Sequence, residues 1–470
     1  MRWSSFLLLL VLLGLPASVW ADDRPNVLVI LCDDLGYGDL ECFGHPSIKT
    51  PHLNQLAAEG VRLTSCYSAA PVCSPSRAGL ITGQTPTQLG IYDWIPAGSP
   101  MHVQKQEATV AKLLKDAGYQ TGLFGKWHCN GKFNSPDQPQ PGDMGFDYWF
   151  ATQNNAAPTH ENPNNFVRNG KEVGPTAGYS CQVVAGEASK WLEQRDPAKP
   201  FFALVTFHEP HEPIASPAAL VETYPDADKK GEALYYANVT NMDRAVGSLM
   251  ETLKRLKLQD NTLVLFTSDN GPETLDRYPN AWRSHGSSGP LRGMKLHIYE
   301  GGIRVPGIAR FPGHVPAGIE SDQPVCSLDI LPTCCELAGV ELNDTSKLDG
   351  TSLVGMFEGK TIQREKPLFW HYYRAYGDGK VAVRDGDWKL VALWDQGEVK
   401  PGAAYKKGDY PLIAGAKFTK FELYNVTEDI GEKENVASQQ PQVVARLRKA
   451  LLDKYATATA NAPDWFSEAK

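Results

Sequence analysis

Acidic and amide side chains follow two strongly apolar runs of the sequence. Asp33 and Asp34 come shortly after the run NVLVIL, and Asp269 and Asn270 follow the run TLVLFT. Four side-chain oxygen donors, three of them carboxylates, favour a hard cation such as Ca²⁺ or Mg²⁺. The histidines and cysteines lack the spacing of a zinc site. Separately, the aspartate pair could cap a helix and the Asp-Asn-Gly run could form a turn, so only their combination predicts a metal site.

One cysteine stands in a segment that could carry a nucleophile. Residues 71–83 include Cys73, Pro75 and Arg77. Pro75 suits the first turn of a helix, which would put Cys73 just before a helix N-terminus, where backbone N–H groups favour negative charge. Arg77 would lie one turn later on the same face. The alternative for a lone cysteine is a buried structural thiol beside a surface arginine.

The elements that must position these residues alternate between strands and helices. Apolar β-branched runs are typical of strands covered on both faces, and apolar spacing of three and four residues is typical of helices. The strands are expected at 26–31, 61–67, 121–124, 201–207 and 262–267, and the helices at 53–60, 108–117 and 234–256. This order predicts an α/β fold with a mostly parallel central sheet flanked by helices. At the carboxyl edge of that sheet, His211 would join the aspartates.

The pattern of the sequence changes near residue 365. Short strands separated by Asp-Gly turns are expected at 368–373, 380–384 and 388–393, with another at 421–425 and a final helix over 436–455. We therefore expect a catalytic domain over residues 22–365 and a smaller C-terminal α+β subdomain with an antiparallel sheet over residues 366–470.

The first 21 residues have the pattern of an export signal. Arg2 precedes an apolar run over 6–15, and small residues around Val19 and Ala21 predict cleavage after Ala21. The apolar run is short for a membrane span, although a retained anchor is the alternative, and no later segment is long and apolar enough to cross a bilayer. We expect an exported protein, periplasmic or secreted, without stable membrane insertion after signal cleavage.

The mature chain is acidic. The formal net charge is −8, and loss of Arg2 with the signal would make it −9. Such a chain has no overall electrostatic attraction for nucleic acid, which is not an expected partner, or for a polyanionic substrate. Local cations in a pocket must therefore hold any anionic substrate.

All nine cysteines follow residue 21. An odd number in an exported protein indicates one cysteine with a function of its own. If that residue is Cys73, the other eight could be paired or free.

The sequence resembles the formylglycine-dependent sulfatases of the alkaline-phosphatase-like superfamily. Residues 71–83 fit the family signature in which Cys-x-Pro-x-Arg is the modification site. Residues 118–128 are similar to a second signature, from which Phe124 departs because a smaller residue is usual there. Further family motifs follow in the family's order at 25–27, 33–39, 210–211, 267–271, 291–295, 299–306 and 423–425. The resemblance covers nearly the whole chain after the signal, and it favours the arylsulfatase A and N-acetylgalactosamine-6-sulfatase type.

The resemblance implies a modified nucleophile and one Ca²⁺ ion. Cys73 would be oxidised during export to formylglycine (3-oxoalanine) by a formylglycine-generating or sulfatase-maturating enzyme, and then hydrated to a geminal diol. Asp33, Asp34, Asp269 and Asn270 are similar to the family's calcium ligands, with the modified Cys73 also reaching the metal.

The resemblance also implies roles for five further residues. Arg77 and Lys126 would stabilise the diol oxygens and the sulfate, and Lys295 would be a second sulfate-contacting lysine. His211 would lie beside the leaving-group oxygen, and His128 would take a proton from the diol. Cleavage of a sulfate ester needs a strong nucleophile, neutralisation of the sulfuryl oxygens and an acid for the leaving alcohol, which these residue types can supply.

The expected function is hydrolysis of sulfate esters, with a sulfated carbohydrate as the preferred substrate class. One alternative is a phosphonate or phosphate monoester hydrolase of the same fold, and a formylglycine phosphonate hydrolase would share the Cys73 motif. Another is a catalytically silent homologue that binds sulfated glycans. Polar residues of the loop 153–165 and His371 could also contact substrate.

Overall fold

The computed structural model describes residues 24–467, except residues 228, 276, 378 and 461. The expected signal peptide, residues 1–21, lies outside the described residues. Among the described helices, none combines the length and the apolar character needed to span a bilayer.

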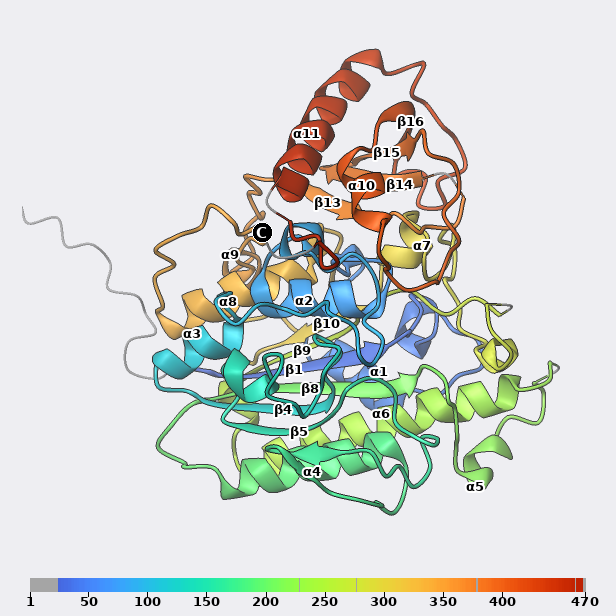
Figure 1. Ribbon diagram of the computed structural model, residues 1–470. Helices are drawn as coiled ribbons and strands as arrows, with labels where there is room; N and C mark the ends of the chain where they lie inside the picture. Colours follow the sequence, from blue (N-terminus) through green and yellow to red (C-terminus); the bar gives the residue numbers. More distant parts are fainter. Residues whose placement is uncertain (1–23, 228, 276, 378, 461, 468–470) are drawn as a thin grey trace, which may run out of the picture.

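A ten-stranded sheet forms the centre of the molecule (Figure 1). Its strands lie in the order β11 (Ile319–Ser321), β2 (Val61–Leu63), β10 (Gly307–Arg310), β9 (Thr262–Ser268), β1 (Asn26–Asp33), β8 (Phe201–Pro210), β4 (Gln120–Lys126), β5 (Tyr148–Thr152), β6 (Val167–Arg168) and β7 (Lys171–Glu172). The five strands from β9 to β5 are parallel, whereas β10 is antiparallel to both of its neighbours. The predicted mostly parallel sheet is confirmed.

Helices cover both faces of this sheet (Figure 1). One face carries α1 (Pro51–Ala58), α4 (Ser180–Gln194) and α6 (Glu232–Arg255), and the other carries α2 (Cys73–Thr82), α3 (Val110–Asp116) and α8 (Ile330–Ala338). Strand β1 shows why both faces are closed. Val27 and Val29 belong to one hydrophobic core, whereas Leu28 and Ile30 belong to the other, because successive side chains of a strand point to opposite faces.

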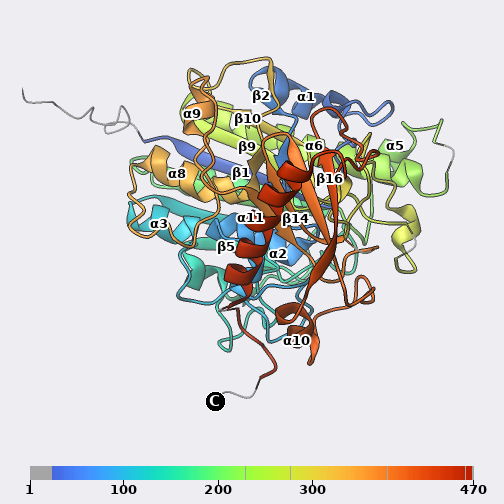
Figure 2. The ribbon, with the colours of Figure 1, turned by 90° about the horizontal axis from the view of Figure 1, so that it is seen from above.

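The C-terminal part forms a separate antiparallel sheet with one long helix across it (Figure 2). Its strands are β13 (Leu368–His371), β14 (Gly379–Asp385), β15 (Trp388–Trp394) and β16 (Phe418–Asn425), and the helix is α11 (Pro441–Ala460). These elements were expected, but α11 begins later than residue 436. Val436 N–H instead donates to the carbonyl of Leu423 at 2.9 Å, and Pro441 suits the first helical position.

Short elements complete the chain. They are α5 (Ala218–Val221), α7 (Glu300–Ile303), α9 (Val354–Phe357), α10 (Asp409–Ala414) and the parallel pair β3 (Cys66–Tyr67) and β12 (Val325–Cys326). The single strand expected over 61–67 is therefore two strands, β2 and β3, which belong to different sheets.

The register of the central sheet brings four strand ends together. Asp33 of β1 pairs with Pro210 of β8, and Cys32 pairs with Ser268 of β9. On the other side of β8, Gly125 of β4 pairs with Thr206. The residues that follow these strands therefore meet at one edge, as expected for a parallel sheet.

Candidate active site

Three carboxylates and one amide gather where β1 and β9 end. The backbone N–H of Asp34, a residue in the left-handed region with φ +64°, donates to Asp269 Oδ1 at 3.2 Å. Asn270 Nδ2 donates to Asp34 Oδ1 at 2.7 Å and to the carbonyl of Gly271 at 2.8 Å. The buried Oδ1 of Asn270 has no hydrogen-bond partner among the described residues.

Each of these carboxylates has its own cation. Lys126 Nζ lies 2.6 Å from Asp33 Oδ2, and Lys295 Nζ lies 2.6 Å from Asp34 Oδ1. Arg77 Nη2 lies 2.7 Å from Asp269 Oδ2. All six side chains are buried, and buried charges persist only when paired in this way.

Burial and neighbouring charge shift the acids in different directions. Burial tends to raise the pKa of Asp33, but the cations around it, Lys126 foremost, hold it well below its usual range. Burial also opposes ionisation of Asp34, and Lys295 is the main cation that keeps its pKa lowered. For Asp269, burial and the neighbouring Asp33 carboxylate raise the pKa to about 7. Three carboxylates so close together favour a bound cation.

Cys73 lies beside this group. Helix α2 begins at Cys73 itself, not after it as the sequence suggested, because Val72 is the extended N-cap residue. The thiol is 3% exposed, and its Sγ lies 3.4 Å from Asp33 Oδ1. Arg77, one turn further along α2, also donates through Nη1 to the carbonyl of Lys126 at 2.8 Å. Burial and the nearby Asp33 raise the pKa of the Cys73 thiol far above its usual value.

Two histidines complete the group. Nδ1 of His211 lies 2.5 Å from the carbonyl of Glu212 and must donate to it, and Nε2 lies 3.5 Å from Asp34 Oδ2. His128 Nε2 donates to the carbonyl of Ile95 at 3.1 Å, and its buried Nδ1 has no partner in the part of the chain that the structure describes. Burial lowers the pKa of both imidazoles.

The donor atoms fit a hard divalent cation. Potential ligand atoms of Asp33, Asp34, Cys73 and His211 all lie within 4.8 Å of one another, and Asn270 adds its unpartnered oxygen. A thiol and an imidazole alone would suit a softer metal, but the carboxylate and amide oxygens favour Ca²⁺ or Mg²⁺.

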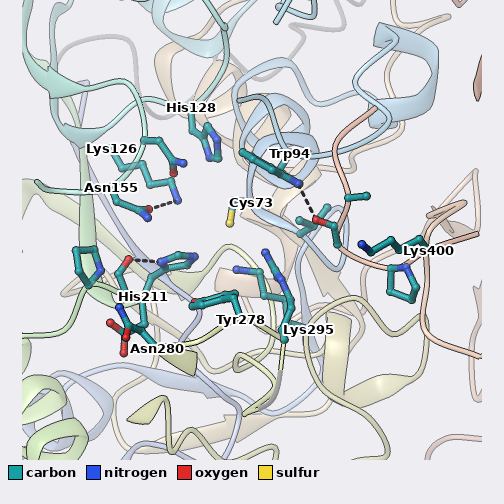
Figure 3. A pocket seen from close by; sticks show the side chains of 18 residues that line it. Cys73, Trp94, Lys126, His128, Asn155, His211, Tyr278, Asn280, Lys295 and Lys400 are labelled. Atoms are coloured by element: carbon teal, nitrogen blue, oxygen red, sulfur yellow. Dashed lines mark hydrogen bonds between the residues drawn. The ribbon is translucent and has the colours of Figure 1, made fainter. Parts of the chain in front are cut away.

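An open cavity of about 570 Å³ leads to Cys73 (Figure 3). Its lining includes Lys126, His128, His211 and Lys295, so the structure brings the sequence-predicted residues to one cavity or directly behind its wall. Asn154, from the polar loop singled out in the sequence, lines it as well.

Sequence reasoning missed another part of the lining. Trp94, Arg277 and residues 400–403 face the same cavity, and no motif marks them. Residues 400–403 lie in the connection between β15 and α10, far from Cys73 along the chain. The only available signal would have been an aromatic and basic residue in loops, which is too common to be specific.

His371, a candidate from the sequence, and His208, three residues before His211, do not line the cavity. His208 is buried between Thr152 and Ser180, with both hydrogen bonds at 2.7 Å. His371 does not reach the pocket, because its Nδ1 is hydrogen-bonded to Thr87 Oγ1 at 2.9 Å. All nine cysteines are free thiols, so the inference from their odd number has no support in the structure.

Comparisons with known proteins agree on one family. The family model described as Sulfatase matches residues 25–340, and the model described as N-sulphoglucosamine sulphohydrolase, C-terminal, matches residues 294–401. Arylsulfatase A of Homo sapiens is 34% identical over 476 residues, which cover 94% of this chain and 90% of the relative. N-acetylgalactosamine-6-sulfatase of Sus scrofa is 32% identical over 488 residues, covering 96% and 88%.

A solved structure agrees with these relatives. The crystal structure of Ps i-CgsB in complex with k-i-k-neocarrahexaose superposes with a TM-score of 0.79 at 28% identity and covers 95% of both chains.

Proposed function

Because the chain belongs to the sulfatase family and is a sulfuric ester hydrolase, we propose that it removes sulfate from carbohydrates at the cavity around Cys73. One observation carries this proposal. A buried thiol at the head of α2 lies beside three carboxylates, each paired with a cation, at the end of an open cavity.

We infer that Cys73 acts after conversion to formylglycine. The unmodified thiol is a poor nucleophile at neutral pH, because burial and Asp33 hold it protonated. Hydrated formylglycine supplies one hydroxyl for attack on sulfur and a second whose proton can be removed when sulfate is released. A maturating enzyme of the host is the implied partner for this conversion.

The proposed metal is one Ca²⁺ ion. Asp33, Asp34, Asp269 and Asn270 would hold it, and position 73 would contact it. When bound, the ion supplies positive charge that lowers the pKa of a neighbouring hydroxyl and neutralises sulfuryl oxygens. The partnerless Asn270 oxygen and the raised pKa of Asp269 support this assignment.

Two lysines and one arginine would bind the sulfuryl group. Lys126 and Lys295 line the cavity with ammonium groups that can donate to the sulfate oxygens. Arg77 lies behind them and fixes both Asp269 and the Lys126 backbone. Preorganised donors of this kind stabilise charge that develops in the transition state.

The histidines would move protons. In His211, Nδ1–H is held by the Glu212 carbonyl, so Nε2 is the atom that can protonate a leaving alcohol when the ring is an imidazolium, the form that the Asp34 and Asp33 carboxylates favour against burial, which lowers the pKa of this imidazole. In His128, Nε2–H is held by the Ile95 carbonyl, so the partnerless Nδ1 is the atom that can accept a proton from the residue at position 73. Burial keeps the His128 imidazole neutral, as a base requires.

A carbohydrate fits the cavity better than sulfate alone does. A volume of about 570 Å³ is in the range of sites for ligands far larger than sulfate. The related Ps i-CgsB structure contains a neocarrahexaose.

We also propose export to the periplasm or medium, with residues 1–21 as signal, 22–365 as catalytic domain and 366–470 as the smaller subdomain.

Peptide mass spectrometry over the Cys73 segment tests the proposed nucleophile. In protein from its native host, we expect the cysteine to lose sulfur and two hydrogens and gain one oxygen. An unmodified thiol there would contradict the mechanism.

Rates on an aryl sulfate and on an aryl phosphonate, measured side by side, test the reaction. A preference for the phosphonate would favour the alternative hydrolase.

A further inference from the structure

The cavity has a second wall that the reacting sulfate does not need. Figure 3 shows Trp94 and Lys400 on one side of Cys73, with Lys126 and Asn155 on the other. Lys126, His211 and Lys295 already surround the reacting position. The wall formed by Trp94, Arg277 and residues 400–403, here called the distal wall, is therefore available to the rest of the substrate.

Lys400 is the basic residue of this cavity whose charge is not offset. Lys126 and Lys295 pair with aspartates at 2.6 Å, and Arg277 Nη1 lies 3.1 Å from Glu273 Oε2. Lys400 is exposed and lines the cavity, yet its ammonium has neither an ion pair nor a hydrogen bond within the described ranges. An uncompensated cation facing a cavity, in a chain of net charge −8, attracts an anion locally.

The backbone that carries Lys400 is held in place. Buried Arg374 donates through Nη1 to the Lys400 carbonyl at 3.0 Å, and its Nη2 lies 2.6 Å from Asp409 Oδ2. Trp94 Nε1 donates to the Gly402 carbonyl at 3.2 Å. These bonds fix the main chain of the loop while leaving the Lys400 ammonium free to meet a ligand.

Gly402 brings the same loop against Arg277. It adopts φ +68°, and a Cβ built on it would lie only 3.1 Å from Arg277 Nε. A side chain at this position would therefore be strained and would crowd the guanidinium. The close approach sets Lys400 and Arg277 along one wall, with Glu273 shared between Arg277 and Lys295, 3.5 Å from the Lys295 ammonium.

We propose that Lys400 binds a second anionic group of the substrate, distinct from the sulfate that is cleaved. The group is a carboxylate or a further sulfate on the same or the adjoining sugar, and either would form a charge-assisted hydrogen bond with the ammonium. This inference rests on the proposed function, since it names the substrate class of the same site: a sulfated carbohydrate with at least two negative charges.

The test compares the converted, Ca²⁺-loaded enzyme with its Lys400→Gln variant on three kinds of substrate. These are a monosulfated neutral sugar, a disulfated sugar and a sulfated disaccharide containing a uronate. We expect Lys400→Gln to lower the ratio of kcat/KM for a two-anion substrate to that for the one-anion substrate by about tenfold to 100-fold, mainly through KM. Whether the loss falls on the disulfated sugar or on the uronate identifies the anion.

Lys407→Gln is the matched control. Lys407 is exposed on the same connection and does not line the cavity, so its substitution removes the same charge and should leave the ratio as in the wild type. Equal losses on all three substrates, or no loss on any, would overturn the proposal.

Binding separates this inference from the proposed reaction. Calorimetry with Cys73→Ala protein, with and without Lys400→Gln, measures affinity for the same sugars without turnover. We expect Lys400→Gln to weaken binding of the two-anion sugars about tenfold or more. It should weaken binding of the sugar whose only charge is one sulfate less. Equal affinities would refute the role of Lys400 even if the enzyme cleaves sulfate esters. Absence of turnover in the wild type would refute the proposed function while leaving the binding result readable.

Discussion

Lys126 Nζ lies 2.6 Å from Asp33 Oδ2, and both side chains are fully buried. The pair joins the ends of β4 and β1, which are separated in the sheet by β8. An isolated charge at this depth would be very costly, so the two residues depend on each other. Lys126 of this pair also lines the cavity, so the lysine proposed to bind sulfate also supports the folded sheet edge.

We therefore expect Lys126→Met to reduce both stability and activity. Without the Lys126 ammonium, Asp33 has lost its nearest cation. In the presence of a chelator, the free energy of unfolding should therefore fall by about 3–5 kcal/mol. Urea unfolding measures this loss. Lys132→Met is the control, because Lys132 pairs with Asp137 at 3.1 Å while 45% exposed, and such pairs contribute about 1 kcal/mol or less. Similar losses for both variants would show that the buried pair contributes no more to the free energy of unfolding than the exposed pair does.

Calcium should stabilise the folded protein measurably. A ligand that binds only the native state adds about 2.7 kcal/mol to the free energy of unfolding at 100 times its Kd. Asn270→Ala removes the partnerless oxygen and should weaken this stabilisation, whereas Asn343→Ala, on an exposed loop, should retain it. Thermal unfolding across a calcium titration gives the comparison. An unchanged response in Asn270→Ala would remove Asn270 from the ligand set.

Lys389 should be important for stability, because it joins the C-terminal sheet to the rest of the protein. Its fully buried ammonium lies 2.9 Å from Glu300 Oε1 and 3.0 Å from Glu432 Oε1. Burial raises the pKa of Glu432 to about 7, whereas Lys389 is the main reason that the pKa of Glu300 falls to about 2 despite burial. Lys389→Met should cost about 3–5 kcal/mol in urea unfolding, because two buried acids lose their shared cation. Adding Glu432→Gln should recover part of that loss; no recovery would mean that lost packing explains it.

Stability should fall in mild acid, partly because of His371. Burial, with a smaller contribution from the charge of Lys380, lowers the pKa of His371 to about 3. Its value in the unfolded chain is near 6.5, so between those two pH values the unfolded state binds more protons. The contribution of neutral His371 to the free energy of unfolding is therefore complete above pH 6.5. It decreases by up to about 1.36 kcal/mol per pH unit as the pH drops toward 3.

Urea unfolding of His371→Gln across pH 4–7 checks this expectation. The variant should show a shallower loss of stability toward acid than the wild type, whereas His314→Gln, at an exposed position, should follow the wild-type profile. Identical profiles for the wild type and His371→Gln would exclude His371 as a source of the acid sensitivity.

Part of the site could be predicted from pattern alone. Asp33, Asp34, Asp269 and Asn270 follow buried strands, and parallel strands deliver such residues to one edge. The positions of His128 and Lys295 were implied only by family resemblance, because neither follows from periodicity. The structure places both at the cavity, Lys295 through its pair with Asp34.

The distal wall could not be predicted in this way. Trp94 and the loop that carries Lys400 are joined by a hydrogen bond from Trp94 Nε1 to the Gly402 carbonyl, and no local signal specifies a contact between segments so far apart in the chain. For the same reason, the sequence did not reveal that β10 runs against its neighbours or that α2 begins at Cys73. Local propensity predicts the elements, but long-range packing decides their direction, ends and neighbours.

The connection that carries Lys400 has a consequence for how this enzyme can diversify. Residues 400–403 contact the cavity without belonging to β1, β4, β8 or β9, whose ends hold the reacting groups. Two hydrogen bonds, from Arg374 and Trp94, attach this loop by its backbone carbonyls, so they place no constraint on the side chain at position 400, although Gly402 is held to glycine by its positive φ and by Arg277. If the distal wall binds the substrate as proposed, exchange of the side chain at position 400 would alter substrate preference without touching the strand ends that hold the reacting groups.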